Sequence, residues 1–287
     1  MDDSDALAQR FEAHRGHLRA VAYRMLGSVA EADDAVQETW LRLARTDTSD
    51  VRNLGGWLTT ALSRICLDML RARATRGEHP LDTHVPDPIV GFEVHSPEQE
   101  ALLADSVGLA LLVVLDTLTP DERLAFVLHD IFGVPFDDVG QILDRSPGAA
   151  KQLASRARGR LRGATAPEAD LPRQRKIVQA FQAAARAGSF DALLALLDPD
   201  VVLRADAGAG PLGPSRVVRG ARAVAAQAMR YSELAKFARP ALVNGTAGAV
   251  AAPGGRVVAV LAVTIRHDRI AEMNILADPE RLQRLIG

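Results

Sequence analysis

The chain has 287 residues, of which 48% are hydrophobic and 24% are charged, a composition typical of a protein with two or three packed domains. Its formal net charge of −2 excludes a uniformly basic or acidic protein, so recognition by charge must come from local segregation of charge. The single cysteine, Cys66, excludes an intramolecular disulfide and is typical of the reducing cytoplasm.

Neither a secretory signal nor a membrane span is expected. Residues 1–5 are acidic where a signal peptide has a basic start. The longest apolar run near the middle of the chain, residues 109–115, is far shorter than the roughly 20 residues of a spanning helix. We therefore expect a cytoplasmic protein with no membrane contact.

The first 76 residues read as helices. Ser28 followed by Glu31 is a capping-box signature and predicts a helix start. A second helix is predicted from Trp57 to about Arg73, with one buried stripe at helical spacing. The stripe consists of Leu58, Ala61, Ile65 and Met69. From residue 77 to 97, four prolines interrupt any periodic pattern, which predicts an extended, semi-rigid linker.

Helices resume after the linker. Ser96-Pro97 and Thr119-Pro120 each precede a Gln or Glu at the spacing of a capping box and predict helix starts. Three helices are then expected, over residues 121–132, 136–143 and 147–162. The short turn between the last two, residues 144–146, predicts a helix-turn-helix.

The last of these helices is strongly basic. Residues 146–162 carry five Lys or Arg and no acid. One face is apolar and suited to packing: Ala150, Leu153, Ala157 and Leu161. The other presents the amide, hydroxyl and basic groups that reach base edges and phosphates in a major groove: Lys151, Gln152, Ser155 and Arg156, with Arg158 further along for phosphate contact. The alternative is a solvated basic face stabilised by the helix dipole; the preceding turn and helix favour DNA.

The last third of the chain has a different character. Residues 173–197 are predicted to form one long amphipathic helix, and residues 221–229 another. Short β-type runs follow the first, bounded by Gly, Pro and Asp. These runs are residues 201–203, 217–218, 241–243, 257–265 and 270–275. We therefore expect a multi-domain protein, all-α in its first half and α+β at its end.

Two separated parts of the chain, residues 27–76 and 136–162, carry a family resemblance. FDDVGQILDRSPGAAKQLASRARGRLR, residues 136–162, resembles the DNA-reading region 4 of extracytoplasmic-function (ECF) sigma factors. Residues 27–43 and 55–76 resemble the polymerase-binding and promoter-melting parts of their region 2. The resemblance implies region 2 at residues 1–76, a linker at 77–97, region 4 at 98–165 and a further domain at 166–287.

For region 2, the resemblance implies two binding surfaces. The acidic helix edge that begins at Glu31 would contact core RNA polymerase through Asp33, Asp34, Gln37, Glu38 and Leu41; the alternative is an exposed acidic helix start. The second segment would contact the −10 promoter element through Asn53, Trp57, Arg64, Asp68 and Arg71. The loop at residues 50–56 would hold an unstacked base.

The last domain resembles the SnoaL-like cone fused to one subgroup of these factors. Residues 81–88 (LDTHVPDP), 206–211 (DAGAGP) and 277–282 (ADPERL) resemble three motifs of that subgroup. The resemblance implies a regulatory domain that contacts the sigma regions or their linker. Enzyme activity is not expected: Asp206, Tyr231 and His267 form no recognisable constellation, and His267-Asp268 reads as a hairpin turn.

The sequence thus predicts a sigma factor that binds core RNA polymerase and promoter DNA, without cofactor or metal. Two alternatives remain. One is a helix-turn-helix regulator that does not bind polymerase, which leaves residues 27–43 and 55–76 unexplained. The other is a SnoaL-like isomerase or cyclase with a helical appendage, which gives the basic helix no role.

Overall fold

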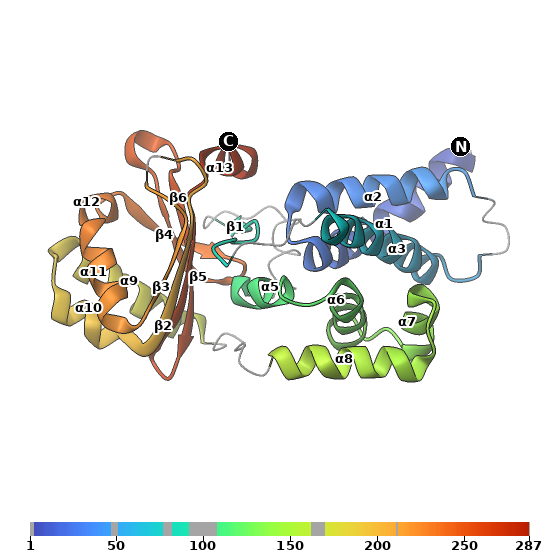
Figure 1. Ribbon diagram of the computed structural model, residues 1–287. Helices are drawn as coiled ribbons and strands as arrows, with labels where there is room; N and C mark the ends of the chain where they lie inside the picture. Colours follow the sequence, from blue (N-terminus) through green and yellow to red (C-terminus); the bar gives the residue numbers. More distant parts are fainter. Residues whose placement is uncertain are drawn as a thin grey trace. The chain divides into compact units, whose positions relative to one another are not determined.

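The computed structural model describes residues 3–46, 51–76, 82–91, 108–161, 170–210 and 212–286 (Figure 1). The chain divides into two compact units. Unit 1 comprises Met1–His79 and Val114–Gly163, and unit 2 comprises Pro80–Val113 and Ala164–Gly287. Several predicted features lie outside the described residues. These are the start of the loop at residue 50, linker residues 77–81 and 92–97, the helix start at Ser96-Pro97, and residues 162–169.

Three helices form the first part of unit 1: α1 (Asp3–Leu26), α2 (Val29–Leu43) and α3 (Leu54–Thr75). Their shared core includes Phe11, whose ring centroid lies 5.2 Å from that of Trp40. In the predicted stripe of α3, Leu58 and Ile65 are buried, whereas Ala61 and Met69 are half-buried. The helix starts earlier than Trp57 because the side chain of Asn53 accepts a hydrogen bond from the Gly56 amide at 3.0 Å.

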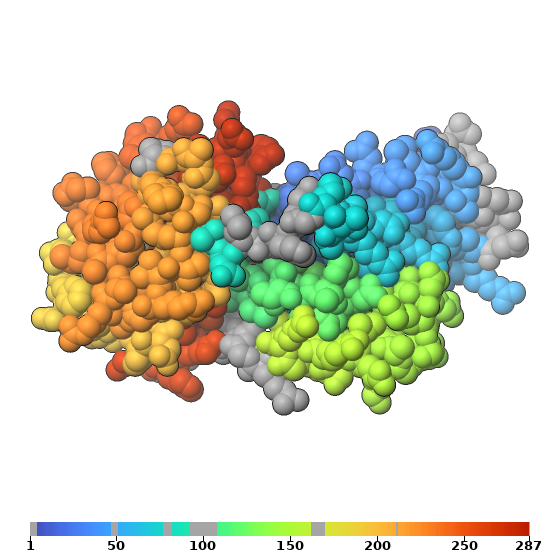
Figure 2. All heavy atoms as spheres, in the orientation of Figure 1, coloured from blue at the N-terminus to red at the C-terminus, as the bar shows by residue number. Residues whose placement is uncertain are grey.

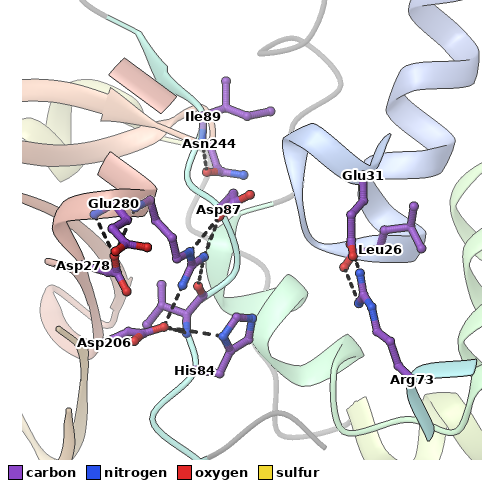
Figure 3. A network of polar contacts seen from close by, with 12 residues as sticks. Leu26, Glu31, Arg73, His84, Asp87, Ile89, Asp206, Asn244, Asp278 and Glu280 are labelled. Carbon is purple, nitrogen blue, oxygen red and sulfur yellow. Dashed lines mark hydrogen bonds and ion pairs between the residues drawn. The ribbon is translucent and has the colours of Figure 1, made fainter. Parts of the chain in front are cut away.

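The capping box predicted at Ser28 does not form. Ser28 is the N-cap of α2, but its side chain makes no capping hydrogen bond. Glu31 instead forms an ion pair with Arg73 of α3 (Figure 3). The matching prediction at Thr119 is confirmed, because Thr119 and Glu122 bond reciprocally at the start of α6. A tertiary ion pair thus replaces a local cap in the first case.

The second part of unit 1 contains the predicted helix-turn-helix. After α5 (Leu109–Leu115) come α6 (Pro120–Phe126), a π-helical turn (Val127–Ile131), α7 (Phe136–Leu143) and α8 (Pro147–Leu161). Asp144 ends α7 in the left-handed conformation, with φ of 54°. This residue turns the chain between α7 and α8.

Gly140 makes the tight turn possible. A Cβ at this position would lie 2.8 Å from the carbonyl oxygen of Arg145, which is backbone and has little freedom to move. We expect Gly140→Ala to lower the free energy of unfolding by about 1–3 kcal/mol. Gly159→Ala is the control, because nothing lies within 4 Å of its added Cβ and the change favours helix. Urea unfolding followed by circular dichroism measures both, and equal midpoints would contradict this role of Gly140.

The two parts of unit 1 are held together by a buried arginine. Arg123 of α6 is 3% exposed and donates two hydrogen bonds of 3.1 Å to the carbonyl oxygen of Arg24 in α1. It also forms an ion pair with Asp116.

The single cysteine is buried in unit 1. Burial raises the pKa of the Cys66 thiol to about 12, so this group stays protonated at neutral pH and is unreactive.

Unit 2 is built on one sheet with the strand order β1-β4-β5-β6-β7-β2-β3. Neighbouring strands are antiparallel except β2 and β7, which are parallel. The strands are β1 (Val90–Gly91), β2 (Leu197–Asp206), β3 (Arg216–Arg219), β4 (Ala238–Val243), β5 (Thr246–Ala251), β6 (Ala259–Arg266) and β7 (Arg269–Leu276).

Four helices lie on the same side of this sheet in Figure 1: α9 (Leu171–Ala187), α10 (Phe190–Leu196), α11 (Ala221–Arg230) and α12 (Ser232–Ala235). Their apolar faces and the inner sheet face form a core that includes Phe181, Leu193 and Val263. The last helix is α13 (Pro279–Ile286).

Some predictions for unit 2 were wrong in detail. The single helix expected over residues 173–197 is two helices, because Gly188 adopts a left-handed φ of 65° and Leu197 already begins β2. Strand β5 was not predicted, since TAGAVA is rich in small residues with low β-propensity. The hairpin turn at His267-Asp268 is confirmed, with φ values of 47° and 63°.

Candidate nucleic-acid interface

Helix α8 presents one open polar face. Its apolar residues Ala150, Leu153, Ala157 and Leu161 are buried, as predicted. The predicted DNA-facing residues of the opposite face are exposed: Lys151, Gln152, Ser155 and Arg156. The helix lies at the surface of unit 1 in the space-filling view (Figure 2). This face is therefore accessible to a groove of nucleic acid.

The arginines of α8 are oriented by acids on the preceding helices. Glu122, which also caps α6, lies 3.5 Å from Arg156 and 3.0 Å from Arg160. Asp130 pairs with Arg158 at 2.7 Å. Among the described residues, no hydrogen bond or ion pair engages Lys151. The arginine side chains of these three pairs are 42–63% exposed, so a phosphate can reach them at the surface of the helix.

Of the residues predicted to contact the −10 element, Arg64, Asp68 and Arg71 are exposed on α3 and Trp57 is half-buried. In this conformation, two of the arginines contact the helix-turn-helix. Arg64 donates to the carbonyl oxygen of Gln141 at 3.3 Å, and Arg71 donates to Asp121 at 2.8 Å. Arg145 donates to the other oxygen of Asp121 at 3.1 Å. The two predicted DNA-binding helices are thus linked through Asp121.

The predicted polymerase-binding edge of α2 is also exposed. Asp34, Gln37 and Glu38 point to solvent, and Leu41 is one of the exposed large hydrophobic residues at 39%. Asp33 is paired with Arg19 of α1 through bonds of 2.6 and 3.0 Å, and Glu38 is paired with Arg42. These side chains are therefore accessible to a partner protein, and their negative charge suits a basic partner surface.

Comparison with known proteins agrees with this arrangement. Residues 10–76 match the family model of Sigma-70 region 2, and residues 108–161 match that of Sigma-70, region 4. The chain is 39% identical to the ECF RNA polymerase sigma factor SigJ of Mycobacterium tuberculosis, over 94% of this chain and 91% of that protein. The chain belongs to the ECF sigma factors.

Further similarities extend over the whole chain of this ECF sigma factor. It is 34% identical to the Probable ECF RNA polymerase sigma factor SigI of M. tuberculosis, over 99% of this chain and 98% of that protein. The crystal structure of SigJ superposes with a TM-score of 0.77 and 36% identity, covering 96% of this chain and 98% of that one. The helical sigma regions and the α+β domain that follows them are therefore both parts of the shared architecture.

In this sigma factor, the linker between region 2 and region 4 is bound to the C-terminal domain. Linker strand β1 pairs with β4, aligning Val90 with Val243. The Ile89 amide donates to the side chain of Asn244 at 3.0 Å (Figure 3).

Within the described residues, every helix is too short or too polar to span a bilayer.

One arginine joins the three motifs of the resemblance. Arg281, from residues 277–282, donates to Asp87 of the linker at 2.6 Å and to Asp206, from residues 206–211, at 2.7 Å. It also donates to the carbonyl oxygen of Val85 at 2.7 Å. Asp87 and Asp206 lie close together around this position in Figure 3. The motifs are far apart in sequence but form one ionic cluster, which we call the linker clasp (Asp87, Asp206 and Arg281).

The carboxylate of Asp206 is held charged in the clasp. Burial alone would raise its pKa, but hydrogen bonds from His84 and the Val85 amide, together with the charge of Arg281, lower the pKa below its ordinary value of 3.8. The other residues weighed as catalytic take part in separate contacts. Tyr231 donates to the carbonyl oxygen of Leu212, and His267 lies in the hairpin turn.

Sequence reasoning missed the roles of Arg281, Asp87 and Asn244. Arg281 and Asp87 lie in segments whose motifs were noticed, and Asn244 follows the strand predicted at residues 241–243. Neither a motif nor a strand pattern indicates which residues meet across a fold. The signal available was the charge pattern, because Arg281 is the one Lys or Arg in the three segments. The segments also hold five acids, Asp82, Asp87, Asp206, Asp278 and Glu280, so pairing of the arginine was expected but its partners were not indicated.

Proposed function

We propose that the chain initiates transcription by binding core RNA polymerase through α2 and promoter DNA through α8 and α3. The main support for DNA binding is the open polar face of α8, which is the second helix of the helix-turn-helix. Acids on the preceding helices pair with Arg156 and Arg158 of this helix. Lys151, Gln152, Ser155 and Arg156 would read the −35 element, with Arg158 on the backbone. Asn53, Trp57, Arg64, Asp68 and Arg71 would face the −10 element.

The polymerase assignment can be tested by reversing charges on α2. We expect the Asp34→Lys/Glu38→Lys variant to bind core polymerase at least about tenfold more weakly, because two acids of the contact surface become basic. The control is Asp5→Lys/Glu12→Lys on α1. Each double variant reverses two exposed acids and breaks one intrahelical ion pair, Glu38–Arg42 or Glu12–Arg15. Binding is measured by titration of labelled protein with core enzyme, and equal losses in both variants would contradict the assignment.

We further propose that this structure is a closed form. In it, residues of region 4 accept hydrogen bonds from the arginines that would bind the −10 element. The contacts of Arg64 and Arg71 with Gln141 and Asp121 support this proposal. Binding to the −10 element requires these arginines to exchange protein acceptors for DNA. Since both pairs are exposed, the exchange costs little.

Asp121→Ala tests the closed form, because it removes the acceptor that Arg71 and Arg145 share. We expect the free chain to bind a single-stranded −10 oligonucleotide about threefold more tightly, as measured by fluorescence anisotropy. Asp137→Ala removes an exposed acid of α7 and is the control. Since both variants remove one negative charge, an equal gain in both would indicate a general charge effect and contradict the closed form.

For the C-terminal domain we propose regulation of the sigma regions in a cytoplasmic protein that is not an enzyme. The linker clasp supports this role, since it ties the segment between regions 2 and 4 to this domain. We place the limits of the regions at residues 1–76, 77–97, 98–165 and 166–287. Asp206, Tyr231 and His267 are engaged in separate structural contacts, which favours regulation over catalysis.

A further inference from the structure

Unit 2 contains a cavity of about 150 Å³ between its helices and the inner face of its sheet. Of the 21 lining residues within the described part of the chain, ten are alanine, from both helices and strands. Ala228 and Ala235 lie on α11 and α12, and Ala205 and Ala249 lie on β2 and β5. Interiors normally exclude voids of this size, because larger side chains fill them. The alanines keep the centre of the domain open.

Two side chains of this cavity each have a buried donor nitrogen without an acceptor among the described residues. Arg216 donates to the carbonyl oxygen of Leu212 at 3.0 Å and to the Tyr231 hydroxyl at 2.6 Å. Its Nε atom is buried and has no hydrogen-bond partner among the described residues. Gln182 is 5% exposed, and its side-chain nitrogen is likewise buried and unpaired in that part of the chain. Both side chains line the cavity.

Charge in the cavity is also unbalanced. Among the described residues, the lining contains Arg216 and no Asp or Glu. A buried donor without an acceptor costs about 1–3 kcal/mol, and more when the group is charged. The missing partner is therefore an acceptor, and a negative one fits the guanidinium best. An apolar cavity of about 150 Å³ holds a molecule of the size of benzene.

We propose that this cavity binds a small apolar carboxylate, either aromatic or short-chain aliphatic. Its carboxylate accepts hydrogen bonds from Arg216 and Gln182, and its apolar body lies against the alanines. The site lies entirely within unit 2, and the proposal does not rest on the proposed function. It assigns to the regulatory domain a ligand of defined chemistry.

The test uses the full chain with benzoate, phenylacetate and hexanoate as probes, and benzyl alcohol as the neutral counterpart of benzoate. We expect at least one carboxylate to bind saturably at millimolar concentration in isothermal titration calorimetry and to raise the melting temperature. Benzyl alcohol should bind at least about tenfold more weakly, because it lacks the charge that pairs with Arg216. No binding by any of the three acids would overturn the proposal.

Variants separate the two parts of the site. Ala249→Leu fills the cavity and should abolish binding, while the melting temperature without ligand stays the same or rises. Arg216→Met and Gln182→Leu should each remove the preference for the acid over the alcohol. Arg239→Met removes an exposed arginine of β4 and should change nothing. Binding that survives Ala249→Leu would exclude this cavity, and a preference that survives both polar variants would overturn the carboxylate assignment.

Discussion

Alanine at both Lys151 and Arg156 is expected to abolish −35-dependent transcription while core polymerase binding is unchanged. Each contact to a base edge or phosphate contributes about 1–3 kcal/mol, so the double change lowers promoter affinity by roughly thirtyfold or more. Folding should be unaffected, because both side chains are exposed and the Arg156–Glu122 pair is weak at 3.5 Å. The measurement is in vitro transcription with core enzyme, alongside titration of polymerase binding.

The matched control replaces two exposed arginines of unit 2, Arg186 and Arg239, by alanine. It removes the same net charge at a distance in sequence from the helix-turn-helix. Normal transcription by the Lys151/Arg156 variant would contradict the recognition-helix assignment. An equal loss of transcription in the control would show that the effect comes from net charge alone.

Arg281→Ala is expected to release the linker from the C-terminal domain. The change leaves Asp87 and Asp206, both largely buried, without their common partner, and breaking such a buried pair costs about 3–5 kcal/mol. Two linker amides report the release directly, since the Val85 amide donates to Asp206 and the Ile89 amide donates to Asn244. Hydrogen exchange at these amides should accelerate by at least about a hundredfold.

Arg284→Ala is the control, because Arg284 is exposed on the same helix, α13. It should leave exchange at both linker amides unchanged. Transcription with core polymerase should change in the Arg281 variant alone, if the clasp regulates the sigma regions. Unaltered protection of Val85 and Ile89 in Arg281→Ala would show that the clasp does not hold the linker.

The clasp should also weaken in acid. The pKa of Asp206 is lower in the folded protein than its ordinary value of 3.8, so its contribution is present above that value and is lost as the pH falls through the folded-state pKa. Linker protection measured by hydrogen exchange should therefore decline below a pH of about 4. Asp206→Asn should show weak protection throughout and a smaller dependence on pH in this range.

Local pattern was enough to predict the helix-turn-helix. The apolar spacing of Ala150, Leu153 and Ala157 fixed which face of α8 is buried, and the Thr119 cap formed as expected. Predictions from local sequence pattern were wrong where tertiary contacts compete with local ones. Glu31 pairs with Arg73 rather than capping α2, and the alanine-rich strand β5 is ordered by its neighbours β4 and β6.

The contacts between segments that are distant in sequence could not be predicted from the sequence. Arg281 and Asp87 are separated by 194 residues, and no periodicity relates them. The same holds for Arg71 and Asp121, which link two helices that were each predicted separately. The basic surface of α8 was predictable because charge and spacing lie on one helix, whereas the linker clasp needs the fold to assemble it.

The linker strand also shields an edge of the sheet. Strand β1 is outermost in the strand order and satisfies backbone groups of β4 at Leu242 and Val243. The opposite end of β4 carries Pro240 and an exposed Arg239, both of which discourage pairing with another chain. Any state in which the linker departs uncovers the unprotected end of β4. Self-association through that edge is the expected consequence in such a state.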